Sequence, residues 1–136
     1  LKAKKLTDKL EKFIVQPYIA GGVETILGIT KDENAGHMIM FGLGGIFVEI
    51  FKDVNFKLVP INDQEAMKMI ESIKSYEMLA GTRGRKSVNI DFIKENLLRL
   101  SQLSEDFQVF EEIDLNPFVF FDEEEKCRIL DARIRV

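Results

Sequence analysis

Residues 23–30, with the sequence VETILGIT, form a short apolar run directly after the glycine pair Gly21-Gly22. A run of this length, bounded by glycine and polar residues, is typical of a β-strand. Upstream of the glycine pair, residues 13–20 form a second run of the same kind, and we expect the two strands to pair as a β-hairpin.

The same succession of apolar runs and polar turns continues downstream, so we expect antiparallel pairing to recur along the chain. Glycine-rich, polar or acidic turns separate these runs, and the dipeptide Asn116-Pro117 with an aromatic run precedes the last of them. The further strands that the sequence predicts are residues 38–41, 46–51, 56–61, 107–115 and 128–136.

Two segments show apolar residues at helical intervals. Asn62 lies three residues before Glu65, as in a capping box, and the spacing then predicts a helix over residues 63–79. A second stripe, with Asn89 as its cap, predicts a helix over residues 89–104. Strands and helices are segregated rather than alternating, so we predict an α+β fold with an antiparallel sheet packed against two helices.

Composition excludes several classes of protein. The chain has 136 residues, 46% hydrophobic and 31% charged, which favours a single globular domain over residues 1–136. With 19 Lys and Arg against 23 Asp and Glu, the net charge of −4 argues against a nucleic-acid partner. A single cysteine excludes an internal disulfide and makes the cytoplasm the expected compartment. No apolar run approaches the roughly 20 residues that span a bilayer, so we expect no membrane partner.

Oxygen-bearing side chains gather near the carboxyl end. Because side chains alternate across a strand, Glu112, Asp114 and Asn116 are expected on one face of their strand. In the last strand the same alternation places Leu130, Ala132, Ile134 and Val136 on an apolar face.

That alternation turns Asp131 to the opposite face, beside Arg133. A hairpin between the two strands sets Asp131 next to Asn116, and such oxygens suit a Mg²⁺ ion that also carries nucleotide phosphates. The alternative is a solvated acidic face paired with Arg133 and Arg135.

Other residues also allow a structural and a functional interpretation. The run 42–45, GLGG, lets backbone amides approach a phosphate, but no Lys-Ser or Lys-Thr follows it, so a P-loop is excluded and a tight connection is favoured. Arg83 and Arg85 suit either an anionic ligand or an exposed basic loop. His37 lacks partners for a triad or zinc site, and Cys127 adjoins an apolar strand end, so we expect structural roles for both.

Taken in order and spacing, several of these segments resemble the carboxyl-terminal part of the ATP-grasp subunit or domain of ADP-forming acyl-CoA synthetases, such as ADP-forming acetate-CoA ligase. This family is related to the succinyl-CoA synthetase beta subunit. The resemblance covers about residues 13–133. The segments are residues 22–29 (GVETILGI), 39–49 (IMFGLGGIFVE), 52–60 (KDVNFKLVP), 81–84 (GTRG) and 112–117 (EIDLNP).

The resemblance implies an enzyme that interconverts acyl-CoA, ADP and phosphate with a carboxylate, CoA and ATP, through an acyl phosphate and a phosphohistidine. It also implies a carboxyl-terminal ATP-grasp subdomain, with nucleotide lying between two α+β subdomains and ATP or ADP and Mg²⁺ as cofactors. Residues 15–18 resemble the strand whose backbone meets adenine, and Glu24 the acidic residue near ribose. The implied site comprises nucleotide-binding Val15, Gln16, Pro17, Tyr18 and Glu24, metal ligands Asn116 and Asp131, and catalytic Arg83 and Asp114.

The sequence also departs from the family. Residues 35–37, AGH, stand where a Phe-Gly-Pro is frequent, so His37 is not expected to be the phosphorylated histidine. The amino-terminal ATP-grasp subdomain, with its phosphate-binding Lys, and the CoA-binding subunit or domain are not among these residues and are the expected partners. Two rival hypotheses are a non-catalytic assembly module with the same fold and another ATP-grasp carboxylate ligase.

Overall fold

The computed structural model describes residues 12–45, 53–82, 84 and 86–136. The strands are β1 (Val23–Asp32), β2 (Gly36–Leu43), β3 (Val54–Leu58), β4 (Glu112–Phe120), β5 (Arg128–Ile129) and β6 (Ala132–Arg135). The helices are α1 (Asp63–Glu71), α2 (Tyr76–Ala80), α3 (Ile90–Asp106) and the 3-10 helix η4 (Glu124–Lys126). The strand expected over residues 46–51 lies outside the described residues.

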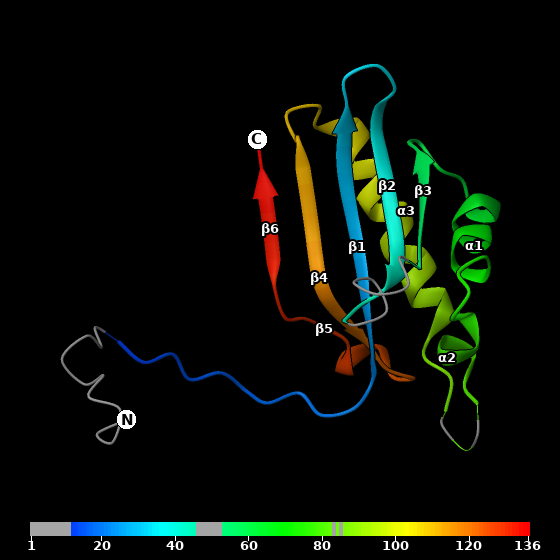
Figure 1. Cartoon of the computed structure of the whole chain (residues 1–136), viewed down its shortest axis with the longest axis vertical. Helices are drawn as coiled ribbons and strands as arrows, with labels where there is room; N and C mark the ends of the chain where they lie inside the picture. Colours follow the sequence, from blue (N-terminus) through cyan, green and yellow to red (C-terminus); the bar gives the residue numbers. More distant parts are fainter. Residues whose placement is uncertain (1–11, 46–52, 83, 85) are drawn as a thin grey trace.

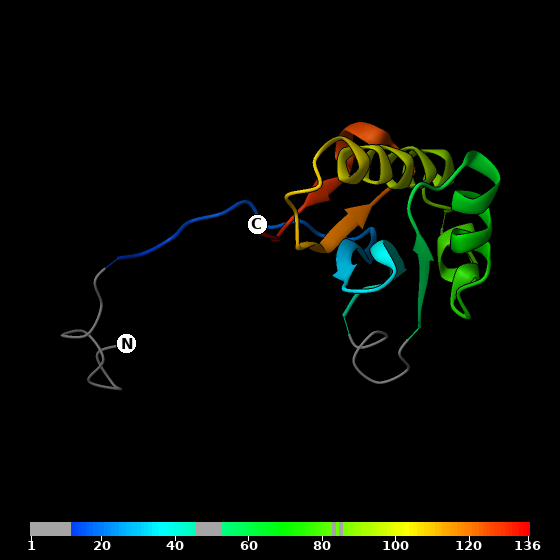
Figure 2. The same ribbon diagram turned by 90° about the horizontal axis from the view of Figure 1, so that it is seen from above.

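The described strands form one antiparallel sheet in the order β3-β2-β1-β4-β5, and β6 pairs with the opposite end of β4. Figure 1 shows α3 running behind the sheet and α1 and α2 beside β3, and Figure 2 shows these helices on one side of it. The predicted α+β class and antiparallel sheet are confirmed. No helix in the described parts of the chain is long and apolar enough to cross a membrane.

Strand β1 lies in the middle of the sheet. It pairs with β2 along one edge and with β4 along the other, and its Leu27 and Ile29 are buried in the core. Because both edges are occupied, no backbone of β1 is free for the expected hairpin with residues 13–20. That prediction is wrong: residues 12–20 form no strand and extend away from the sheet (Figure 1).

Strand β4 starts and ends later than the predicted strand over residues 107–115. Because α3 continues to Asp106, the chain uses residues 107–111 to turn back toward the sheet. Between Leu115 and Phe118, β4 contains one residue more than the facing part of β1, which is a β-bulge. The bulge shifts the alternation of side chains, so Phe118 and Phe120 both enter the core and stack at a centroid distance of 4.1 Å.

The predicted strand over residues 128–136 is divided into β5 and β6. The two short strands pair with β4 on either side of its bulge, where a single regular strand could not keep its register. The expected apolar face of this region is not buried among the described residues: Leu130, Ile134 and Val136 are 44%, 60% and 72% exposed.

Both predicted helix caps are confirmed. The side chain of Asn62 accepts a hydrogen bond from the backbone N–H of Glu65, whose carboxylate accepts one from the N–H of Asn62. At the start of α3, the side chain of Asn89 accepts from the N–H of Phe92 at 2.9 Å.

The single helix expected over residues 63–79 is instead two helices, α1 and α2. The buried carboxylate of Asp53 accepts hydrogen bonds from the backbone N–H groups of Lys74 and Ser75, at 2.7 and 2.8 Å. In a continuous helix these two N–H groups would bond to the preceding turn. Asp53, which precedes β3, therefore holds the break between the helices against the sheet.

The core lies between the helices and one face of the sheet. Each large apolar side chain buried there stabilises the fold by about 1.5–3 kcal/mol relative to exposure. The helical contributors are Ala66, Met69, Ile70, Leu79, Ile93, Leu97 and Leu100, and the strand contributors include Leu27, Ile29, Ile39, Phe41, Ile113 and Phe120.

Asp53→Ala is expected to lower the free energy of unfolding by about 3 kcal/mol at pH 7, because two backbone donors lose a buried, charged acceptor. Burial alone would raise the pKa of Asp53, but hydrogen bonds from Ser75 and Lys74 and the charge of Lys74 lower it below the ordinary 3.8. The stability it contributes is therefore present above that pH and lost as the pH falls through the lowered pKa. Denaturant unfolding at pH 7 and at about pH 3 measures the difference.

The matched control is Asp32→Ala. Asp32 also accepts two backbone N–H groups, from Asn34 and Ala35, but in an exposed turn where water replaces the lost acceptor. We expect a loss below about 1 kcal/mol there. Equal losses in the two variants would contradict the role given to burial of Asp53.

Candidate functional site

The sheet face turned away from the helices carries a row of residues that crosses five strands. The register aligns, from edge to edge, Phe56, Met40, Gly28, Asp114 and Arg133. Directly paired residues of antiparallel strands lie on the same face. This face, which we call the open face, is therefore apolar over β3 and β2 and charged over β4 and β6.

A second row, two residues along, has the same layout. It contains Leu58, Met38, Thr30, Glu112 and Arg135 in the same strand order. The predicted alternation is confirmed for Glu112 and Asp114, because Ile113 between them is buried in the core on the helix side.

Asp114 is the electrostatically unusual residue of the open face. Its Oδ1 atom is buried and has no hydrogen-bond partner among the described residues. Desolvation raises the pKa of Asp114 above the ordinary 3.8, the charge of Arg133 opposes this rise, and the charges of Glu112 and Asp131 add to it. A buried acceptor without a donor, among like charges, favours uptake of a proton or a cation.

The structure places Asn116 next to Asp131. The backbone N–H of Asn116 donates to the carbonyl oxygen of Asp131 at 3.1 Å, and the N–H of Leu130 donates to the carbonyl oxygen of Pro117 at 2.9 Å. The β4 bulge and the link between β5 and β6 therefore lie side by side. Three of the residues predicted from the sequence, the third being Asp114, are thus brought to one region of β4.

The donor atoms in this region suit a hard divalent cation. Within the described ranges, no three His, Cys, Asp or Glu side chains form a group that could hold a metal on their own. Mg²⁺ does not require such a cage, since it usually keeps waters and binds one or two carboxylates together with substrate phosphates. Asn116 and Asp131, whose backbones adjoin, and Asp114 with its unpartnered Oδ1 supply side-chain oxygens of this chemical kind in one region of β4.

Glu24 lies at the start of β1, beside the glycine-rich end of β2. The N–H of Gly44 donates to the carbonyl oxygen of Glu24 at 2.8 Å, and a Cβ on Gly44 would come within 3.2 Å of the Glu24 backbone. Gly42 is equally confined, because a Cβ there would lie 2.5 Å from the carbonyl oxygen of Asp53. These glycines permit close approach of neighbouring segments, in keeping with the tight connection expected for residues 42–45.

The nucleotide-binding residues predicted at positions 15–18 are not brought to the open face. Val15 and Tyr18 are 94% and 91% exposed, and residues 15–18 extend from the sheet without strand pairing. Arg83, the other predicted catalytic residue, lies outside the described residues, as does Arg85.

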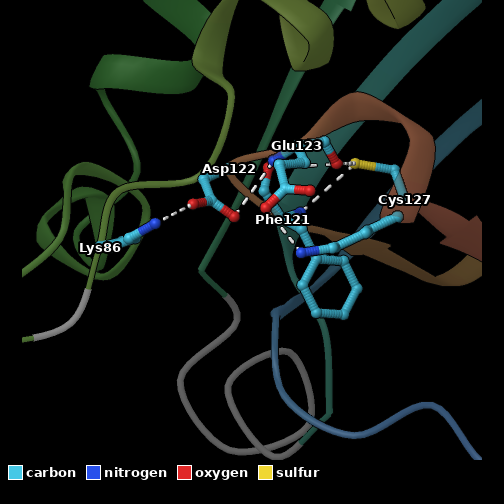
Figure 3. Close-up of polar contacts among 6 residues, drawn as sticks. Lys86, Phe121, Asp122, Glu123 and Cys127 are labelled. Carbon is cyan, nitrogen blue, oxygen red and sulfur yellow. Dashed lines mark hydrogen bonds and ion pairs between the residues drawn. The ribbon is translucent and has the colours of Figure 1, made fainter.

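A cavity of about 450 Å³ lies elsewhere, lined by Gly21, Gly22, Val23, Met78, Lys86, Ser87, Val88, Phe121 and Asp122. Figure 3 shows the ion pair between Lys86 and Asp122, 2.8 Å long, and the neighbouring thiol of Cys127. The N–H of Phe121 donates to Cys127 Sγ at 3.3 Å, and burial raises the pKa of that thiol. A raised pKa makes a thiol less nucleophilic at neutral pH, which agrees with the packing role predicted for Cys127.

His37 also has the structural role predicted for it. The side chain is only 5% exposed, and its Nε2 lies 2.7 Å from the carbonyl oxygen of Phe110. This contact ties β2 to the turn before β4.

Comparison with known proteins gives the family. A family model described as an ATP-grasp domain matches residues 1–136. The chain belongs to the ATP-grasp family.

Two curated relatives are similar to nearly the whole of this ATP-grasp chain. One is the acetate–CoA ligase [ADP-forming] II subunit beta of Pyrococcus furiosus, 44% identical over 97% of the chain and 57% of that protein. The other is the 4-hydroxybutyrate–CoA ligase [ADP-forming] of Nitrosopumilus maritimus, 44% identical over 97% of the chain and 19% of that protein. The chain thus spans about half of the first relative and about a fifth of the second.

A solved structure shows that the fold is shared. The dinucleotide forming acetyl-coenzyme A synthetase 1 of Ca. Korarchaeum cryptofilum, in complex with coenzyme A and Mg-AMPPCP, superposes with a TM-score of 0.80 at 39% identity. The match covers 86% of this ATP-grasp chain and 54% of that chain.

Several open-face residues escaped the sequence analysis. Met40, Phe56 and Gly28 were predicted only as parts of strands, and Arg133 only as a neighbour of Asp131 and a partner of the acidic face. The alternation of residues 53–58, with polar odd positions and apolar even positions, already indicates that β3 has an apolar face. Which strands continue that face is a matter of register, which this alternation does not specify.

Asp114→Asn is expected to raise the melting temperature of this ATP-grasp chain at pH 7. The folded-state pKa of Asp114 is raised, so ionisation costs stability as the pH rises from the ordinary 3.8 through the raised pKa, and the neutral amide removes this cost. The gain should shrink as the pH falls toward 3.8, where the wild-type carboxyl is also protonated. Thermal unfolding between about pH 3 and pH 8 tests this, with the exposed Glu125 changed to Gln as the control.

Proposed function

We propose that the chain is the nucleotide- and Mg²⁺-binding carboxyl-terminal subdomain of an ADP-forming acyl-CoA synthetase. The observation that supports this proposal is that the backbones of Asn116 and Asp131 adjoin each other on β4, two residues along the strand from the buried, unpartnered Oδ1 of Asp114. Identity of 44% to an ADP-forming acetate–CoA ligase beta subunit supports the reaction class.

Asn116 and Asp131 would hold the cation, and Asp114 would stand behind them as a negative charge that strengthens their hold. Bound Mg²⁺ would neutralise charge on the phosphates during phosphoryl transfer. The raised pKa of Asp114 supports this assignment, because a nearby cation removes the cost of ionising a desolvated carboxylate.

The apolar half of the open face would carry the less polar part of the nucleotide. Phe56 and Leu58 are 49% and 54% exposed there, although apolar side chains of this size favour burial. Glu24 would meet the ribose, and the backbone of residues 15–18 would meet the adenine. In this proposal residues 15–18 fold against the nucleotide only when the other half of the cleft is present.

The partners in this proposal are the amino-terminal half of the ATP-grasp domain and a CoA-binding subunit or domain. The related archaeal synthetase is in complex with coenzyme A, and its phosphohistidine segment points towards the nucleotide binding site. Here His37, the only histidine of the 136 residues, is buried and engaged with Phe110. A phosphorylated histidine would therefore have to come from outside these residues.

Asp131→Asn in the complete enzyme is expected to reduce Mg²⁺-dependent turnover by at least about tenfold, with little effect on the melting temperature. The change removes one charge from an exposed ligand at nearly constant size. Turnover as a function of free Mg²⁺ is the measurement, and the exposed Asp106 changed to Asn is the control. Wild-type turnover in the variant would favour a different ligand set.

The same titration separates the rival functions. An assembly module would bind ADP weakly and without dependence on Mg²⁺, even after the missing half is added. Another ATP-grasp carboxylate ligase would bind Mg²⁺ and ATP but use an acceptor other than CoA.

Arg83→Ala in the complete enzyme is expected to raise the KM for phosphate or ADP, because a guanidinium binds phosphate through paired hydrogen bonds. Steady-state kinetics in both directions measures the effect. The control is Arg99→Ala, which removes an exposed arginine of α3 that pairs with Glu95. Unchanged kinetics for Arg83→Ala would contradict phosphate binding and favour the alternative, in which Arg83 belongs to an exposed basic loop.

A further inference from the structure

Two arginines of β6 stand opposite two carboxylates of β4 in the same register. Arg135 faces Glu112, and Arg133 faces Asp114. The first two residues form an ion pair, with Arg135 Nη2 3.5 Å from Glu112 Oε2. Arg135 Nε also lies 3.7 Å from Glu111 Oε2. Among the described residues, Arg133 makes no ion pair with Asp114 or with any other carboxylate.

This difference is not explained by charge, because each arginine has a carboxylate directly across the ladder. The Asp114 Oδ1 atom is buried and is satisfied by no donor, yet the neighbouring guanidinium of Arg133 does not reach it. The side chain of Arg133 is itself exposed, and the arginine hydrogen bonds found among the described residues belong to Arg99 and Arg128. As far as the described residues are concerned, its five N–H donors are thus available to a ligand on the open face.

Arg133 also lies two residues after Asp131, on the side of the sheet that carries Asp114. An anion bound through a cation at Asn116 and Asp131 would come within reach of its side chain. Guanidinium groups bind phosphoryl oxygens in a bidentate manner and stay charged at all relevant pH values.

We propose, on the basis of the function proposed above, that Arg133 binds the phosphate oxygens of the metal-bound nucleotide. Asp114 lies opposite Arg133 without pairing with it, so the guanidinium can donate to the phosphates when a nucleotide binds. Arg135, held by Glu111 and Glu112, does not take part.

A purely charge-balancing Arg133 has the opposite signature. Removing a cation beside Asp114 and Asp131 would then strengthen Mg²⁺ binding by those carboxylates and leave nucleotide affinity unchanged at saturating Mg²⁺. If Arg133 binds phosphate, its removal instead lowers the affinity for nucleotide and leaves the Mg²⁺ concentration needed for half-saturation nearly unchanged.

The test uses the complete enzyme with Arg133→Gln, Arg133→Lys and, as the matched control, Arg135→Gln. We expect Arg133→Gln to raise the KM for ATP at saturating Mg²⁺ by at least about tenfold, with half-saturating free Mg²⁺ changed less than about twofold. Arg133→Lys should recover part of the loss, since a lysine keeps the positive charge but cannot make the paired hydrogen bonds of a guanidinium. Arg135→Gln should change neither quantity more than about twofold. Melting temperatures report whether each variant folds.

Lower half-saturating Mg²⁺ with an unchanged KM for ATP in Arg133→Gln would overturn the proposal and assign Arg133 to charge balance. An equal rise in KM in Arg135→Gln would overturn it as well, because the effect would then be one of net charge. If the wild-type enzyme shows no Mg²⁺-dependent nucleotide use, the proposed function itself fails, and the wild-type measurement reveals this before any variant is compared.

Discussion

The pairing of β1 along both of its edges is the constraint on which the rest of the structure depends. It commits the backbone of β1 to β2 and β4, fixes the register of both neighbours, and so decides which residues share the open face. A shift of one residue in the β4 pairing would move Asp114 into the core and Ile113 into solvent. The burial of Leu27, Ile29 and Ile113 on the helix side therefore also positions the carboxylate on the other side.

The β4 bulge lets one strand contribute apolar residues to the core along its whole length and polar residues to the region of the candidate site. Before it, odd residues such as Ile113 face the core, and after it Phe118 and Phe120 do so. The apolar core can thus continue past Asn116, while the partner strand divides into β5 and β6 and brings Asp131 alongside. Without the added residue, either the aromatic pair or the polar site would lie on the wrong face.

Local sequence patterns correctly predicted the fold class, both helix caps and the alternation around Ile113, because each of these depends on residues close together in sequence. The errors arose where a distant residue decided the outcome. Asp53 interrupts the predicted long helix by accepting the N–H groups of Lys74 and Ser75, and no local signal in residues 63–79 reveals this. Likewise, residues 13–20 have strand character, but the strand they were expected to join has no free edge. For the candidate site, the sequence and the family resemblance named Asp114, Asn116 and Asp131, which stay predictions as ligands. The apolar residues of β2 and β3 on the open face, and the position of Arg133 opposite Asp114, depend on register across the whole sheet.

The open face also contains several features that lower the stability of the fold. Asp114 retains a buried oxygen with no partner among the described residues, Arg133 leaves its opposite carboxylate unpaired, and Phe56 and Leu58 remain about half exposed. Each would be unfavourable in a chain selected for stability alone, and all of them lie on the open face, whereas the core of the fold lies on the opposite face of the sheet. Metal, phosphate and an apolar ligand surface would relieve all of these costs together. The proposed function accounts for these features together, because in it the open face binds a nucleotide against the other half of the cleft.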